Sequence, residues 1–143
     1  MSYLDASEWI NFYGEDEALM VTQLDNPAAT EINAALIEQA LSDASEEANG
    51  YLRSRYSIPV EPTRALQRWV AQIARYMLNR YSPPEIVRKD YEDAMRSLRE
   101  VAKGQKNLGI ETATSQPAGI LGAPELVKRR GGGLFPDIDV GGV

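Results

Sequence analysis

Three consecutive acidic residues, Glu15, Asp16 and Glu17, are the first side chains in the sequence whose type and spacing could do chemistry. Carboxylates are ligands that divalent cations prefer, so the run could hold a metal ion. Adjacent carboxylates repel one another, and no Asp-x-Asp-x-Asp-Gly loop surrounds them. Acids also interact favourably with the dipole at a helix N-terminus. We therefore interpret the run as a solvated helix start and keep a carboxylate-based, metal-dependent hydrolase as an alternative.

The composition removes most other catalytic chemistry. The chain has 143 residues, of which none is cysteine and none is histidine. Without cysteine it can form neither a disulfide nor a thiolate metal site, and without histidine it lacks the commonest general base near neutral pH. We therefore expect no enzymatic activity and no cofactor.

A basic stripe is formed by Arg64, Arg68 and Arg75, which helical spacing places within about 40° of one another, opposite an apolar face. The stripe could bind nucleic acid, be a solvated surface, or meet the acidic first half of a neighbouring copy. The net charge of −6 argues against DNA binding in free solution, because neutralising phosphates needs a strong basic patch. Trp69 and Tyr76 lie at the edge of the same helix's apolar arc, where packing is the default role. We predict that these five residues include an inter-subunit or channel face.

Charge is distributed unevenly along the chain. Residues 1–60 contain 2 basic and 11 acidic side chains, residues 61–104 contain 9 and 6, and residues 105–143 contain 4 of each. The first segment thus carries −9 and the second +3. This asymmetry would let the arginines of the second segment meet the acidic first segment of a neighbouring copy, and such complementarity would orient subunits in a ring.

The sequence ends in KRRGGGLFPDIDVGGV. Glycines 131–133 lack the Gly-x-x-x-x-Gly-Lys-Ser/Thr pattern of a phosphate-binding loop, so we do not expect nucleotide binding. Ile138-Asp139-Val140 alternates like a strand that could add to the sheet edge of another protein. Simple disorder would explain the glycines but not the apolar residues. We therefore predict that the tail docks on a partner through Lys128, Arg129, Arg130, Leu134, Phe135, Ile138 and Val140.

Two short helices are predicted before residue 25. Asp5 suits the N-cap of the first, Glu8 follows three residues later, and Gly14 suits its end. The second occupies EDEALMVTQL and stops before the Asp-Asn-Pro break.

Three long amphipathic helices follow, each with apolar residues that recur on one face. The first has Asn33 as its cap and runs to about Arg55, with Asn49-Gly50 as a point where it could kink or end. The prolines of YSIPVEP then favour an extended crossing segment. The other two helices span residues 63–81 and 84–103, and Gly104 suits the position after the last one. The face predicted to be buried in the second of these helices consists of Leu66, Val70, Ile73, Met77 and Tyr81.

These elements predict an all-α fold, a small helical bundle with three long helices, short N-terminal helices and an extended C-terminal arm. We place the helical domain at residues 1–104 and the arm at residues 105–143, where periodicity ends and 8 of the 11 glycines lie. No apolar run is long enough to span a membrane, and the acidic N-terminus does not resemble a signal peptide. We expect a protein that is made and used in solution.

Four stretches together resemble a known family: DASEWINFYGEDEALMVTQLD near the N-terminus, ALSDASEEANGYLRSRYSIPV, LQRWVAQIARYML and YEDAMRSLREVAKGQKNLGI. In this order they are similar to the head-tail connector or adaptor (head completion) proteins of Mu-like tailed bacteriophages and prophages. The resemblance covers about residues 3 to 110, whereas the tail matches only in character.

The resemblance implies a structural virion protein without catalytic residues. Its copies would form a homo-oligomeric ring, a dodecamer, at the head-tail junction beneath the portal protein and above the tail or stopper protein. Double-stranded DNA would pass through the ring without sequence recognition, and before assembly the protein would be in the host cytoplasm. The arm would dock on the portal, with Lys128 to Arg130 meeting acidic portal surface or channel DNA. A DNA-binding helical regulatory protein stays as the alternative from another class.

Overall fold

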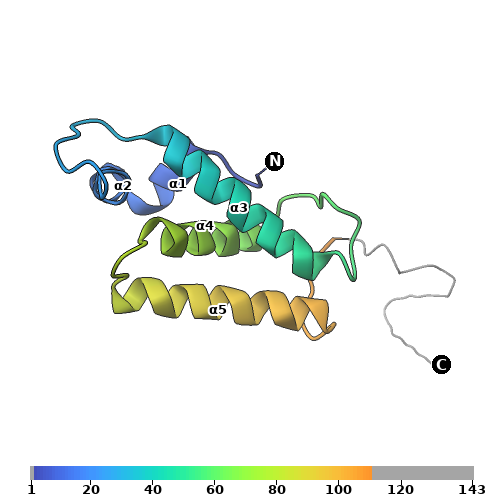
Figure 1. Ribbon diagram of the computed structural model, residues 1–143. Coiled ribbons are helices and arrows are strands. Elements are labelled where there is room, and N and C mark those ends of the chain that lie inside the picture. The colour runs from blue at the N-terminus through green and yellow to red at the C-terminus, as the bar shows by residue number, and fades with distance from the viewer. Residues whose placement is uncertain (1, 111–143) are drawn as a thin grey trace, which may run out of the picture. The chain divides into compact units, whose positions relative to one another are not determined.

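The computed structural model describes residues 2–110, which form five helices and no strand (Figure 1). Two helices are short, α1 (Ala6–Tyr13) and α2 (Glu15–Thr22). Three are long, α3 (Ala34–Leu52), α4 (Arg64–Leu78) and α5 (Glu85–Ala102). The predicted all-α class is therefore confirmed for this part of the chain, and the arm after residue 110 lies outside the described residues.

Side-chain caps begin three of the helices, and the sequence predicts two of these caps, Asp5 and Asn33. The Asp5 carboxylate accepts a hydrogen bond from the backbone N–H of Glu8, and the Glu8 carboxylate accepts one from Asp5, each at 2.9 Å. The side-chain oxygens of Asn33 and Thr63 cap α3 and α4 by accepting from the backbone N–H groups of Leu36 and Leu66. Each cap satisfies a backbone donor that has no partner within its helix, which fixes where the helix starts.

The long helices pack around one core. In Figure 1, α4 lies between α3 and α5, and it packs against both. Fully burying one large aliphatic side chain contributes about 1.5–3 kcal/mol, so this core is the main source of stability. Its buried side chains include Ile37, Leu41, Ala44, Ala48 and Leu52 from α3, Leu66, Val70, Ile73 and Ala74 from α4, and Val87, Ala94, Leu98 and Val101 from α5.

Tyr3 ties the N-terminal segment to the core. Its backbone N–H donates to the Ser45 hydroxyl at 3.0 Å, and its own hydroxyl donates to the side-chain oxygen of Asn49 and accepts from the Val60 N–H at 3.3 Å. Asn49 is therefore a buried polar partner inside α3. The helix continues past Asn49-Gly50 to Leu52, because the amide that signals a turn is used in this network instead.

The predicted end of the second long helix is wrong. α4 stops at Leu78, where Asn79 leaves the helical conformation and its side-chain amide donates to the Arg75 carbonyl at 2.8 Å. Tyr81 therefore lies in the loop before the proline pair, 69% exposed, and not on the buried face. Its hydroxyl donates to Asp25 at 2.5 Å.

The chain folds back after α5. Gly104 has a φ of 82°, the left-handed region expected of a glycine that ends a helix. The backbone N–H groups of Gln105 and Lys106 both donate to the Glu100 carbonyl, and Leu108 is buried. Residues 105–110 thus belong to the same compact unit as residues 58–104 and the residues up to 54.

Candidate interaction surfaces

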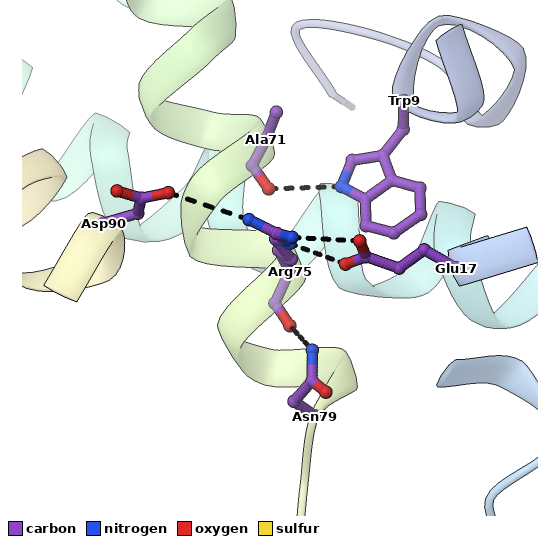
Figure 2. Close-up of polar contacts among 6 residues, drawn as sticks. All are labelled: Trp9, Glu17, Ala71, Arg75, Asn79 and Asp90. Atoms are coloured by element: carbon purple, nitrogen blue, oxygen red, sulfur yellow. Dashed lines mark hydrogen bonds and ion pairs between the residues drawn. The ribbon is translucent and has the colours of Figure 1, made fainter. Parts of the chain in front are cut away.

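Arg75 on α4 is held by two carboxylates from other helices (Figure 2). Its Nε and Nη2 donate to the two carboxylate oxygens of Glu17 on α2 at 2.6 and 2.9 Å, and its Nη1 lies 3.6 Å from Asp90 on α5. The arginine side chain is 16% exposed. Such a bidentate pair is among the stronger ionic contacts in proteins, so Arg75 fixes α2 and α5 against α4.

An aromatic ring covers the same guanidinium. The Arg75 Cζ lies 4.3 Å from the centre of the Tyr13 ring on α1, a cation–π distance. The hydrogen bond to Glu17 raises the pKa of Arg75, so the group stays charged. Burial raises the pKa of Tyr13 to about 12, so its phenol stays neutral beside the ion pair.

Trp9 adds a second anchor between α1 and α4. Its ring is fully buried, and its indole Nε1–H donates to the Ala71 carbonyl at 3.1 Å (Figure 2). A buried indole without this bond would leave a polar group unsatisfied. The bond therefore fixes the position at which α1 crosses α4.

Two of the three arginines of the predicted stripe lie beside aromatic rings of α1. The Arg64 guanidinium lies 6.0 Å from the ring centre of Phe12, and Arg75 covers the neighbouring Tyr13. Arg64 and Arg68 keep exposed side chains, whereas Arg75 is used inside the fold. A polar cleft beside Arg64 has Glu8 and Gln67 in its lining, but both already bond to backbone groups.

The two aromatics predicted on the same surface have partners within the unit. Tyr76 stacks on Tyr91 of α5 with ring centres 4.1 Å apart, and the Lys106 Nζ lies 5.7 Å from the centre of the Trp69 ring. Both rings are only partly exposed. Packing therefore accounts for much of each ring, and contact with another subunit stays a prediction.

The three residues of the acidic run, Glu15 to Glu17, have two different environments. Glu15 and Asp16 are exposed at the start of α2, as interpreted from the sequence, whereas Glu17 is turned to Arg75. Across residues 2–110 no three acidic side chains come together in a way that would hold a metal ion. None of the described helices has the length and apolarity needed to cross a membrane.

The sequence did not reveal the partners of Arg75. Glu17 is 58 positions away along the chain, and nothing in its spacing separates it from the two acids before it. Asp90 and Tyr13 carry no motif either. Only the packing of four helices brings these side chains together. The predicted docking residues of the tail, Lys128, Arg129, Arg130, Leu134, Phe135, Ile138 and Val140, lie outside the described residues.

Comparison with known proteins finds similarity to proteins of phage Mu and of a Mu-like prophage. The family model described as "Bacteriophage Mu, Gp36" matches residues 3–121. The Mu-like prophage FluMu protein gp36 of Haemophilus influenzae is 36% identical over 100 residues, which cover 66% of this chain and 71% of that protein. Gene product J of Escherichia phage Mu is 35% identical over 82 residues, which cover 57% of this chain and 58% of that protein.

The match to the family model covers most of the chain and includes all five helices of the bundle. It confirms the resemblance to Mu-like phage proteins that was inferred from the four sequence stretches. The chain belongs to the bacteriophage Mu Gp36 family.

Proposed function

We propose that this protein is a structural virion protein, a head-tail connector whose copies form a ring between the portal and the tail and surround the DNA exit channel. The observation that carries the proposal is membership of the Mu Gp36 family, whose model matches residues 3–121. The proposal places the protein at the head-tail junction of the virion, and in the host cytoplasm before assembly.

The described bundle suits a protein whose role is to hold its neighbours in fixed positions. Through buried or partly buried polar contacts, Trp9 and Arg75 each join helices that are distant in the sequence, and Tyr3 joins the segment before α1 to α3. Such contacts resist sliding of one helix over another, because each displaced partner would leave a desolvated polar group. A rigid unit of this kind can hold the tail or stopper protein in a fixed position relative to the portal.

The charge of the unit suits DNA that passes without being held. Residues 1–52 contain 11 acidic and no basic side chains, and α3 is the longest element of that segment. Such a surface repels phosphates, and binding to DNA would need the opposite sign. This negative charge therefore favours passage of DNA without sequence recognition.

The C-terminal arm is the proposed portal-binding element. After three basic residues and three glycines it carries Leu134 and Phe135, and then apolar and acidic residues alternate from Asp137 to Val140. Ordering such an arm on a partner costs conformational entropy, so one copy would bind weakly. Many copies on one ring would raise the effective concentration of each arm, and docking would become strong only after the ring has formed.

Association with portal particles tests the proposal. The full chain should co-sediment with purified portal rings, and a variant that ends at residue 127 should lose most of this association. A control chain in which Leu134, Phe135, Ile138 and Val140 are replaced by serine keeps the length and charge of the arm and should also fail. Equal binding by all three proteins would exclude the arm as the docking element, and no binding by the full chain would exclude the connector role.

The alternative function, a DNA-binding regulatory protein, can also be tested, because Arg64 and Arg68 are exposed and could contact DNA. A DNA-binding regulator would shift duplex DNA in a gel, and the shift would weaken steeply as salt is raised. The connector proposal expects no such shift from the free protein.

A further inference from the structure

An apolar groove opens between α2, α3 and α4. Val21, Leu36, Ala40, Met77 and Leu78 supply its apolar walls, and Gln39, Asp43 and Arg80 also line it. Leu36 is 38% exposed, and Met20 on α2 is 48% exposed. Four large apolar side chains are exposed in the described part of the chain, and Leu36 is the one that lines this groove.

The size of the groove decides what it can hold. Its volume is about 250 Å³, which is below the range of about 300–1,000 Å³ typical of small-molecule sites. It has room for one or two side chains. An inserted aliphatic side chain is therefore a better occupant than a cofactor or a metabolite.

The charge beside the groove is unbalanced. The acids of α3 are Glu38, Asp43, Glu46 and Glu47, of which only Asp43 lines the groove, and α3 contains no basic residue. None of the ion pairs among the described residues includes one of these four acids. Asp43 accepts a hydrogen bond only from the neutral Gln39 amide. Two charged residues line the groove: Arg80 is paired with Asp25, whereas Asp43 has no cation among residues 2–110 and is left to meet one on a partner.

A matching surface lies on α5 of the same protein. Ile86 is 57% exposed, and Lys89 follows three positions later, on the same side of the helix. Lys89 is exposed and forms no ion pair with any residue between 2 and 110, unlike its neighbour Arg88, which pairs with Glu85 and Glu92. An apolar side chain with an adjacent cation is complementary to an apolar groove with an adjacent acid.

We propose that the groove of one copy receives Ile86 of a second copy, with Lys89 of that copy meeting Asp43. This contact deepens the proposed ring function and rests on it, because it names the surfaces through which the copies join. The groove is lined by α2, α3 and α4, and α5 takes no part in it. The two surfaces of one copy are therefore different, and each copy can bind two neighbours. Such a head-to-tail contact closes into a ring when the rotation between copies allows it.

Single-cysteine variants test the contact directly. The natural chain has no cysteine, so Leu36→Cys and Ile86→Cys each carry one reactive thiol and no background. With a short bismaleimide, a mixture of the two variants should give a covalent dimer, and the double variant should give a series of larger oligomers. Lys103→Cys, on the other end of α5, is the matched control and should not join to Leu36→Cys.

The cross-linking is carried out at millimolar protein concentration and again after incubation with portal rings. Absence of the 36–86 product under both conditions overturns the proposal, as does equal cross-linking of each variant to itself. Two further variants add an independent measurement, in which Leu36→Glu and Ile86→Glu should each be monomeric by light scattering and should form a dimer when mixed. Circular dichroism checks that both substitutions, which are at exposed positions, leave the fold intact. If both proteins stay monomeric in the mixture, the head-to-tail contact is contradicted.

The outcome separates this inference from the connector role. If the natural protein binds portal rings but gives no 36–86 product, the interface is wrong and the connector role stands. If the product forms but the natural protein does not bind portal rings, the interface stands and the connector role is wrong.

Discussion

At the residue scale, the Arg75 contact gives a stability prediction. Arg75→Ala would leave Glu17 and Asp90 partly buried without their cation. Removing one partner of a fully buried pair costs about 3–5 kcal/mol, and we expect about 2–3 kcal/mol here because the site is partly exposed. Urea denaturation measures the change. Arg68→Ala, an exposed arginine on the same helix, should change stability by less than about 0.5 kcal/mol, and equal losses would mean that the ion pair contributes nothing.

Tyr13 gives a prediction in alkaline solution. Its pKa in the folded protein is about 12, above the ordinary value of 10.0, so folding favours the neutral phenol. The resulting stabilisation is fully present below pH 10 and is lost as the pH rises from 10 to 12. A shift of this size corresponds to a loss of at most about 2–3 kcal/mol. Urea unfolding at a series of pH values should therefore show a steeper decline for the natural protein than for Tyr13→Phe, and parallel declines would contradict the buried position of this phenol.

At the scale of elements, Tyr3 decides whether the N-terminal segment stays on α3. Tyr3→Phe keeps the ring but leaves the Asn49 side chain and the Val60 N–H without their partner. Leaving buried polar groups unsatisfied costs about 1–3 kcal/mol, which a thermal or urea transition would show. Tyr81→Phe removes a hydroxyl from an exposed residue and should have an effect below about 0.5 kcal/mol. If both changes have the same small effect, Tyr3 does not anchor the segment.

The elements also show what the sequence could and could not predict. Asp5, Asn33 and Thr63 each cap a helix because the cap bonds with residues three positions away, and such local contacts leave a pattern in the sequence. The end of α4 was placed too late because Tyr81 continues the apolar period although the prolines after it stop the helix. Asn49-Gly50 stayed a point where α3 could kink or end, because the partner that holds Asn49, Tyr3, is 46 positions away. The caps Asp5 and Asn33 and the helix start at Thr63 could therefore be predicted, whereas the polar contacts between helices could not.

At the scale of the whole unit, the unequal charge of the two segments is partly used within one chain. Glu17 pairs with Arg75, and Asp25 pairs with Arg80, so two acids of the first segment meet two cations of the second. From the sequence we considered such pairing only between copies, whereas these two pairs form within one chain. Asp43 on α3 and Lys89 on α5 form no such pair among residues 2–110, and they are the charges that the proposed contact between copies would use.

The last prediction concerns the residue at which the folded unit ends. The glycine after α5 turns the chain back, and Leu108 then lies 8% exposed although the loss of periodicity suggested an arm from residue 105. Truncating a buried leucine costs about 2–5 kcal/mol, and we expect about 2 kcal/mol for Leu108→Ala because the site lies at the edge of the unit. Ile86→Ala, at a 57% exposed position, is the matched control and should cost less than about 1 kcal/mol. Urea denaturation of the full chain measures both. If Leu108→Ala is as mild as Ile86→Ala, residues 105–110 contribute nothing to the core and the unit ends with α5.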